Sequence, residues 1–509
     1  MQTVTDTLAA KTIAKLRKLS WNLLISWDKS YNAGVNFFTI GSSTIGGLDI
    51  IKGTGDVVQE WDKYDYTDYS NRVLNFEWTR EQDPYIGGAI MSIADITLDN
   101  HDDLFTPGQP GSVLASFILP WRPVRLYAGF GDEVVPVFVG LIERMPDVDT
   151  RSKTVKIHCI DFMQSLFNFP LDEAVILQDN TTDQIISTLL QLAGLTASQM
   201  DLDTGEQVIP FFFANKGDKL GPYLRDLASA ELGKVYMDEN GIIKFLNRTN
   251  WLASTSTSWV FNRANTLERR TTTDDNIINV VEVHSDAREV LANQKYWQLS
   301  GSVLVLAGTS VDIWADFIDP VVTVDAPVYI TSATTSLYET SSGAAVTSVT
   351  TTQFATSFKM TFTNSGATNV DITNIELWAT PAPATKKVYA REEDATSITN
   401  YHQRPVDITN NFIQDISTAQ SIALILIEDN KEFNPVRELE VVGVPQLQVG
   451  DTIRVTDEQV SDLYNIIKIA SKMMPTQFNQ TIIAVKKTIH TYFRVGLSSI
   501  GSSQDVIAP

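Results

Sequence analysis

The sequence has a single cysteine, Cys159, in 509 residues. One thiol excludes a disulfide within the chain and a zinc site built from several cysteines. Five histidines are scattered, and none forms a pair at metal-ligand spacing. No apolar run approaches the roughly 20 residues that a membrane-spanning helix needs. The N-terminus lacks the long uncharged core and cleavage site of a secretory signal, so we expect synthesis in a reducing cytoplasm.

Basic residues are also scarce. The sequence has 39 Lys and Arg against 61 Asp and Glu, which gives a formal net charge of −22. A nucleic-acid-binding surface needs a field of Lys and Arg, so this balance argues against one. It also argues against adhesion to an anionic membrane. It is compatible with DNA that moves past an acidic wall without binding. The length and the 43% hydrophobic content predict about three or four soluble globular domains.

Alternation with a period of two, broken by turn residues, predicts short strands over residues 21–168. This region is expected to form a mostly antiparallel barrel or sandwich. Residues 1–20 predict a helical arm ahead of it. The pattern of residues 169–250 predicts an α+β unit, with a helix that has Thr182 as its N-cap and a hairpin turn that ends in Gly241.

Residues 300–385 are rich in Thr, Ser, Val and Ala, and they show no helical period. We interpret them as a β-sandwich inserted into a second β block made of residues 251–299 and 386–492. That block includes a helix with these residues facing inward: Ile416, Ala419, Ala423, Leu424 and Ile427. The Ser- and Gly-rich residues 493–509 predict a flexible tail. The expected fold class is mainly β with α+β parts.

The stretch 98–107, LDNHDDLFTP, gathers three carboxylates, an amide and an imidazole. An EF-hand loop that starts at Asp99 fails, because its sixth position is not glycine and its twelfth is not glutamate. Zinc would need a second His or Cys nearby. We therefore interpret the stretch as a turn that ends a strand, with Phe105 returning to the core.

Catalytic patterns are missing as well. His158 and Cys159 are adjacent in a strand, so their side chains point to opposite faces and cannot form a dyad. His284 and Asp286 flank Ser285, and such close neighbours do not meet in triad geometry by themselves. The sequence has no phosphate-binding loop, dinucleotide pattern or nucleophile elbow. We predict no catalytic residue, no metal site and no cofactor.

The turn and the strands after it resemble the first barrel of tail-hub proteins from long-tailed bacteriophages. That family is related to the central baseplate hub of contractile phages and to the spike carriers of type VI secretion. Its turn reads Asn-x-Asp-x-x-Phe-x-Pro, which Asn100, Asp102, Phe105 and Pro107 match. Further matching positions are Phe138, Gly140, Ile142 and Asp161.

The C-terminal half resembles the second barrel of the same family. There a Ser-Ile-x-x-Tyr-Gly-x-Arg element precedes a helix and a Gly-Asp turn at a strand entrance. The matching residues here are Ser397, Ile398, Tyr401, Arg404, Gly450 and Asp451, with His402 where glycine is usual. Glycine suits a positive φ, and the Asp side chain is expected to bond the amides that follow. The resemblance covers roughly residues 21–300 and 388–490.

This resemblance implies two tail-tube-like β-barrels in a structural protein of the virion tail tip. Three chains would present six barrels to a six-fold tube and three-fold symmetry to the tip below. The implied partners are further copies of the chain, a tail-tube or distal tail protein, tip or fibre proteins, a tape-measure protein, and DNA that passes without specific binding. Two alternatives stay open: a receptor- or carbohydrate-binding protein acting through residues 300–385, and a tail-associated cell-wall hydrolase.

Overall fold

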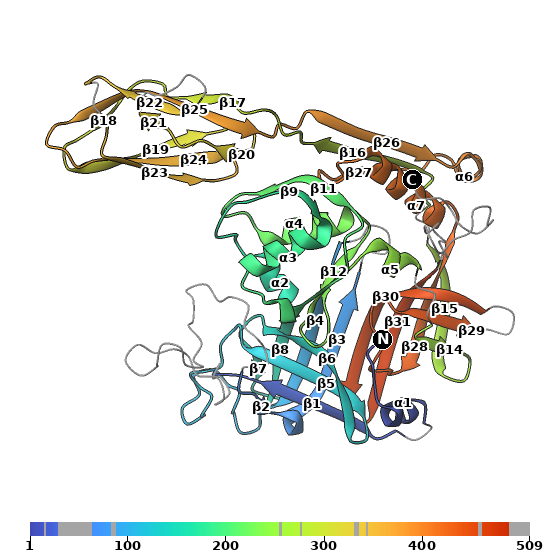
Figure 1. The fold of residues 1–509 in the computed structure, drawn as a ribbon. Coiled ribbons are helices and arrows are strands. Elements are labelled where there is room, and N and C mark those ends of the chain that lie inside the picture. Colours follow the sequence, from blue (N-terminus) through green and yellow to red (C-terminus); the bar gives the residue numbers. More distant parts are fainter. Residues whose placement is uncertain are drawn as a thin grey trace.

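Strands dominate the computed structural model, as the sequence predicts, and they group into one large sheet and several smaller ones (Figure 1). Within the described part of the chain, no helix is long and apolar enough to cross a membrane. The described residues are 1–14, 17–28, 64–82, 88–253, 257–274, 277–329, 335–342, 345–456 and 461–487.

The first β block supplies one half of the large sheet. Its strands are β1 (Leu19–Ile25), β2 (Thr67–Asp68), β3 (Val73–Glu81), β4 (Gly88–Asp99), β5 (Pro123–Phe130), β6 (Glu133–Ile142), β7 (Asp147–Asp149) and β8 (Thr154–Asp161). Hydrogen-bonded neighbours run in the order β2, β1, β5, β6, β8, β4, β3. Alternate residues of these strands build one core, in which Phe76, Leu98, Phe105 and Phe138 are fully buried.

The second β block supplies the other half. Its strands are β14 (Trp259–Phe261), β15 (Thr266–Asp274), β28 (Asn434–Val442), β29 (Thr452–Thr456), β30 (Ser461–Met474) and β31 (Gln477–Lys486). β30 pairs with β31, which continues through β28 to β15. The start of β30 pairs with β29, and β14 runs parallel to β29.

The two blocks share one sheet, which differs from the expectation of two separate barrels. β3 pairs antiparallel with β30, from Phe76 opposite Met473 to Glu81 opposite Lys468. Within the described residues, no ladder joins the outer strands of either block to each other, so neither block is a closed barrel. The physical reason is that the second half of β30 bonds to β3, and it continues the sheet instead of closing it.

The α+β unit packs beside this sheet and extends it, because β12 runs parallel to β4. Its strands are β9 (Val175–Thr181), β10 (Met200–Leu202), β11 (Val208–Ala214), β12 (Lys234–Met237) and β13 (Ile243–Leu246), and its helices are α2 (Phe162–Phe167), α3 (Thr182–Leu192), α4 (Leu220–Ser229) and α5 (Arg248–Ala253). Thr181 caps α3 in a capping box with Gln184, one residue before the predicted cap. Gly241, at a φ of 86°, closes the turn between β12 and β13.

A separate three-stranded sheet follows, although its strands were expected in the second barrel. It consists of β16 (Val280–Ala287), β26 (Lys386–Glu393) and β27 (Pro405–Thr409), with helices α6 (Ala395–Tyr401) and α7 (Ile416–Asn430). Ala419, Ala423 and Ile427 of α7 are buried in the core shared with this sheet. Ile416 and Leu424 are about half exposed, so their predicted inward position was wrong.

The described residues between 294 and 381 form two facing sheets at one end of the molecule (Figure 1). The strands are β17 (Gln294–Gln298), β18 (Val303–Val305), β19 (Thr309–Asp316), β20 (Val321–Val324), β21 (Val328–Tyr329), β22 (Leu337–Thr340), β23 (Ser348–Gln353), β24 (Ser357–Asn364) and β25 (Val370–Pro381). Their inward residues make a core of their own, which includes Phe358, Phe362 and Leu377.

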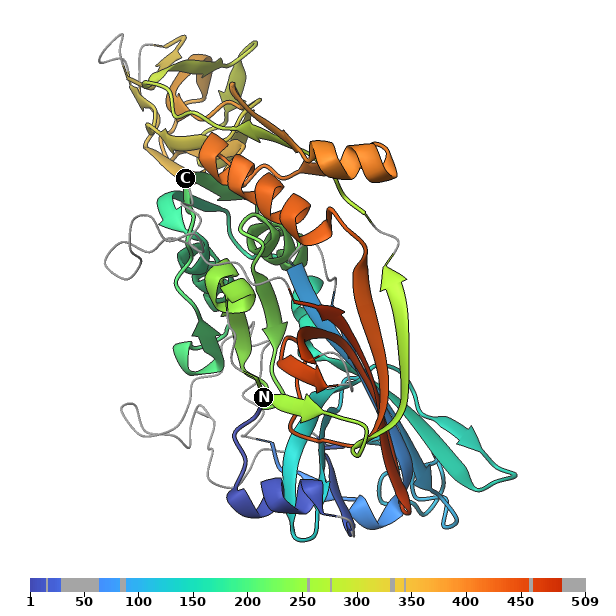
Figure 2. The same cartoon turned by 90° about the vertical axis from the view of Figure 1, so that its right-hand side faces the viewer.

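The N-terminal helix α1 (Asp6–Ile13) lies at the end of the large sheet that is farthest from these facing sheets (Figures 1 and 2). Thr5 caps it by accepting a hydrogen bond from the Leu8 amide at 3.1 Å. The expected arm therefore contains one short helix. The predicted flexible tail, residues 493–509, lies outside the described residues.

Candidate functional site

Residues 100–108 form a turn that the Asn100 side chain holds together. Its Oδ1 accepts a hydrogen bond from the Phe105 amide at 2.8 Å, and its Nδ2 donates to Thr106 Oγ1 at 3.0 Å. Asn100 is almost fully buried and Phe105 fully so. Pro107 follows in the turn ahead of Gly108, which has a φ of 68°. The amide thus replaces the backbone bonds that the strand loses at its end.

The charged groups of this stretch have separate partners and do not converge on one point. Asp102 pairs with Arg72 at 2.7 Å, and this contact lowers the pKa of the Asp102 carboxyl. Asp103 pairs with Lys153 at 3.1 Å. His101 contacts Asp99 through Nδ1 at 2.5 Å. An ion would need several of these oxygens at a common centre.

Gly140 and Asp161 face each other where β6 meets β8. A Cβ atom on Gly140 would lie 2.2 Å from the Ile160 carbonyl oxygen, so only glycine fits there. Asp161 Oδ2 accepts a hydrogen bond from the Ser92 amide at 2.6 Å. Burial of this side chain raises the pKa of Asp161 to about 6.

Asp161 belongs to a buried chain of polar contacts, here called the junction network: Asp161, Ser92, Arg80, Glu239 and Gln448. Arg80 Nε donates to Ser92 Oγ at 2.6 Å, and Arg80 Nη1 pairs with Glu239 Oε1. Gln448 Nε2 donates to the other oxygen of Glu239. The network therefore crosses from the first β block, through the α+β hairpin, to the second β block.

The Gly450–Asp451 turn lies next to the junction network. Gly450 has a φ of 94°, a conformation that favours glycine. Asp451 Oδ2 accepts from the Gln448 amide at 2.8 Å, which precedes it in the chain; the expected bond to following amides was wrong. Its Oδ1 accepts from Ser258 Oγ at 3.2 Å and contacts the Met1 ammonium. The turn thereby joins the N-terminus to both parts of the second block.

Ser397, His402 and Arg404 gather around buried Asn279, which immediately precedes β16. Asn279 Nδ2 donates to Ser397 Oγ at 3.2 Å and to the His402 carbonyl at 2.8 Å, and its Oδ1 accepts from the Arg404 amide at 2.7 Å. Sequence reasoning missed Asn279, because nothing near it in the chain shows its distant partners. The ring of Tyr401 packs edge-on against Phe433.

His402 has a φ of 61° and a ψ of 173°. This region is essentially restricted to glycine, because a Cβ atom crowds the backbone there. The structure thus gives a physical reason for the glycine that is usual at this position in the resembling family. The histidine side chain is exposed.

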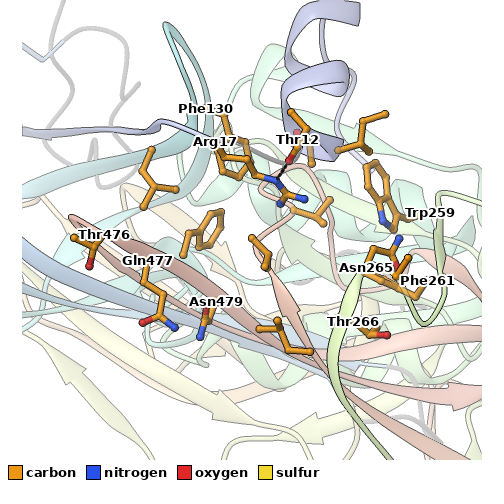
Figure 3. Close-up of a pocket in the computed structure, with 18 residues that line it drawn as sticks. Thr12, Arg17, Phe130, Trp259, Phe261, Asn265, Thr266, Thr476, Gln477 and Asn479 are labelled. Atoms are coloured by element: carbon orange, nitrogen blue, oxygen red, sulfur yellow. Dashed lines mark hydrogen bonds between the residues drawn. The ribbon is translucent and has the colours of Figure 1, made fainter.

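A groove of about 670 Å³ lies between the C-terminal end of α1, Arg17, the β14–β15 hairpin and the ends of β28 and β31 (Figure 3). Phe130, Trp259 and Phe261 contribute aromatic rings, and Arg17 lies over the ring of Phe130 at 5.5 Å. Among the described residues that line it, there is no carboxylate, histidine or cysteine. This lining suits a contact surface and lacks the groups of acid–base catalysis.

Glu282, His284 and Asp407 form a group that sequence reasoning missed. Each offers one potential ligand atom, and these atoms all lie within 4.8 Å of one another. Glu282 and His284 are alternate residues of β16, so they share a face of the sheet. That spacing was visible in the sequence, whereas the position of Asp407 depends on the pairing of β16 with β27.

No family model and no curated protein matches the chain. Solved structures similar to it include a 43 kDa tail protein of prophage MuSo2 from Shewanella oneidensis, at 12% identity and a TM-score of 0.44, covering 84% of this chain and 96% of that one. A tail protein from Neisseria meningitidis has 10% identity and a TM-score of 0.44, covering 84% and 94%.

An Escherichia coli component of the type VI secretion system has 9% identity and a TM-score of 0.37, covering 82% of this chain and 74% of that one. The first two of these structures are described as tail proteins and the third as a component of a type VI secretion system. The function proposed below rests on the chain's own residues.

Proposed function

We propose that this chain is the structural tail-tip hub of a bacteriophage. In this proposal three chains form a ring around the DNA channel and join the six-fold tail tube to three-fold tip or fibre proteins. A tail-tube or distal tail protein binds above the ring, and a tape-measure protein ends at it. The basis is the ordered set of motif residues in both β blocks, from Asn100 to Asp451, together with the joint between the blocks.

The observation that carries the proposal is the ladder between β3 and β30, here called the seam. An adaptor must hold its two tube-facing blocks at a fixed angle, and here six consecutive residue pairs join them through backbone bonds. On the outside, Lys468 pairs with Glu81 at 2.7 Å, and Lys472 pairs with Glu77. On the inside, the junction network fixes the α+β unit to both blocks.

The proposed ring uses the sheet edges of each block that do not take part in the seam. Sheet strands with open backbone groups pair readily with another chain unless they are protected. Each block uses one side at the seam, and in the proposed ring the opposite side meets the neighbouring chain. Six blocks then surround the axis in three chains, and closed symmetry limits further growth.

The acidic composition supports the role of a DNA channel. With a net charge of −22, carboxylates on the channel wall would repel DNA phosphates and keep the genome mobile. Electron cryo-microscopy of intact tails tests the assembly directly. We expect three copies in one ring on the tail axis. Six copies, a position off the axis, or a channel wall of Lys and Arg would contradict the proposal.

The proposal assigns no catalytic role. Cys159 is fully buried in β8, and burial raises the pKa of its thiol. A hydrolase nucleophile needs an exposed thiol with a lowered pKa, so this cysteine does not fit that alternative. A zymogram with bacterial cell walls provides the test, and a clear lytic band from the purified chain would contradict the assignment.

A second candidate function is glycan or receptor binding through residues 300–385. Half of the aromatic residues there are buried, but Trp314 is half exposed and its ring stacks on that of Phe354, with centroids 5.5 Å apart. Exposed aromatic faces are common platforms for sugars and other flat ligands. A glycan array separates the two functions. Binding that is lost in Trp314→Ala and kept in Ile318→Ala, a control at an almost fully exposed position, would favour this candidate.

A further inference from the structure

The three-stranded sheet of β26, β16 and β27 has one face on α7 and one face toward solvent. Along β16, Val281, Val283 and Ser285 are buried, whereas Glu282 and His284 are only partly covered. In the parallel ladder with β27, Glu282 lies directly beside Asp407. Neighbouring side chains on one face of a sheet are about 5 Å apart, which brings an imidazole and two carboxylates together.

The side chains around this group hold its donors in place. Glu282 Oε2 faces His284 Nε2 at 3.6 Å, while its other oxygen, Oε1, faces Arg391 Nε at 3.5 Å. The ring of His284 packs on Tyr389, with centroids 5.0 Å apart. One carboxylate oxygen is thus oriented by a cation while the other is directed at the imidazole, an arrangement typical of metal ligands and their supporting contacts.

The other histidines that contact carboxylates differ in geometry. His158 reaches Asp95 through Nδ1 and Glu143 through Nε2, so its two acids lie on opposite sides of the ring. His101 contacts Asp99, its neighbour in the turn, through Nδ1. Within the described part of the chain, Glu282, His284 and Asp407 are the group in which three potential ligands converge.

We propose that Glu282, His284 and Asp407 bind one divalent transition-metal ion of the zinc class. Nε2 of His284 and one oxygen of each carboxylate supply three ligands, and water completes the shell. One nitrogen and two oxygens suit zinc, whereas calcium takes six to eight oxygens and magnesium keeps most of its waters. The bound ion would tie β16 to β27, the edge strand that leads into α7. This inference is independent of the proposed hub function.

Isothermal titration of the purified, chelator-treated full chain with ZnCl₂ tests the site. We expect one ion per chain for the unchanged protein, and little response to MgCl₂. His284→Ala and Asp407→Asn should each weaken zinc binding by about tenfold or more, because they remove a direct ligand. His101→Ala is the matched control, since it removes a surface histidine beside a carboxylate outside the group, and it should bind zinc like the unchanged chain.

Thermal melts without metal separate loss of a ligand from loss of the fold. We expect the His284→Ala and His101→Ala variants to melt like the unchanged chain without zinc, and only His284→Ala to lose the zinc-induced rise in melting temperature. Absence of stoichiometric zinc binding by the unchanged chain would overturn the proposal. Equal weakening by His101→Ala, or full binding by both His284→Ala and Asp407→Asn, would overturn it as well.

Discussion

Arg80 and Glu239 form an ion pair across the boundary between the first β block and the α+β unit, and both side chains are less than a tenth exposed. Neither charge has access to bulk water as an alternative partner. Burying two charges is costly, so the pair adds specificity to the junction more than net stability. The second carboxylate oxygen of Glu239 accepts a hydrogen bond from Gln448, so the same carboxylate also contacts the second β block.

Removing one partner of this pair should be costly. Arg80→Ala leaves the Glu239 carboxylate buried without its cation, and we expect a loss of about 3–5 kcal/mol in the free energy of unfolding. Arg270→Ala is the control, because Arg270 pairs with Glu268 at an exposed position and should cost less than about 1 kcal/mol. Denaturant titration gives both values. Similar losses in the two variants would contradict the importance of the buried pair.

The backbone at His402 offers a stabilising substitution. Because a φ of 61° with a ψ of 173° strains any residue with a Cβ atom, we expect His402→Gly to raise the free energy of unfolding by about 1 kcal/mol. Thr399→Gly in α6 is the control, and it should lower stability by roughly 0.3–0.5 kcal/mol, since glycine is less favourable than threonine inside a helix. A lower free energy of unfolding for His402→Gly than for the unchanged chain would show that contacts of the imidazole stabilise the fold by more than the backbone strain costs.

The strands were predictable from the sequence because period-two alternation is a local signal. The seam was not, because β3 and β30 are separated by almost the whole chain, and no local pattern specifies which strand edge meets which. The junction network shows the same limit. Asp161 was singled out by its motif, but Arg80 and Glu239 become partners only when β4 and β12 lie side by side.

The helix α7 shows where periodicity alone fails. Its sequence is apolar on more than one side, so the predicted inward set included Ile416 and Leu424, which are about half exposed. The packing partner decides the buried face, and that partner is the sheet of β16, β26 and β27. The group of Glu282, His284 and Asp407 could be predicted only in part. The spacing of Glu282 and His284 is a local sequence pattern, whereas Asp407 joins them only through the pairing of β16 with β27.

The buried carboxyl of Asp161 predicts a specific pH dependence. Burial raises the pKa of Asp161 in the folded chain to about 6 from its ordinary 3.8. The folded state then holds this proton more tightly than the unfolded state. The stabilising contribution is complete below about pH 4 and is lost as the pH rises through about 6.

The comparison with Asp161→Asn isolates this effect from other groups. Between pH 4 and pH 7, the unchanged chain should lose about 2–3 kcal/mol relative to the variant, as the pKa difference implies. Denaturant titrations at several pH values measure this difference. A constant difference in stability across this pH range, or one that grows in favour of the unchanged chain, would show that the pKa of Asp161 is not raised in the folded chain.

The turn after β4 depends on the ring of Phe105, which contacts Tyr69 edge-on with centroids 5.2 Å apart. Phe105→Ala leaves a cavity in the first core, and we expect it to cost about 3–5 kcal/mol. His101→Ala changes an exposed side chain in the same turn and should cost less than about 0.5 kcal/mol. Equal small losses by denaturant titration would mean that the ring is not part of the core.

Deletion of the facing sheets tests whether they are an independent insertion. Their ends lie side by side, because the Leu291 amide donates to the Pro381 carbonyl at 2.9 Å and the Glu289 amide to the Pro383 carbonyl at 3.1 Å. A chain that lacks residues 293–382 can therefore be closed by a short Gly/Ser bridge without moving β16 or β26. The deletion removes the core of the facing sheets as a whole, and the other cores keep all of their residues.

We expect the shortened chain to be soluble and to unfold cooperatively, with a melting temperature within a few degrees of the full chain. Side-chain contacts to the retained chain are lost as well. Arg288 Nη1 loses the Ala382 carbonyl at 2.8 Å and Asp319 Oδ1 at 3.5 Å. Thr356 Oγ1 no longer donates to Asn215 Oδ1 of the α+β unit at 3.1 Å. Thr356→Ala in the full chain serves as the control for that contact. Arg288→Ala is the second control, for the Arg288 contacts. If deletion caused aggregation while neither Thr356→Ala nor Arg288→Ala did, the facing sheets would be part of the folding unit, because the lost contacts alone could not account for the failure.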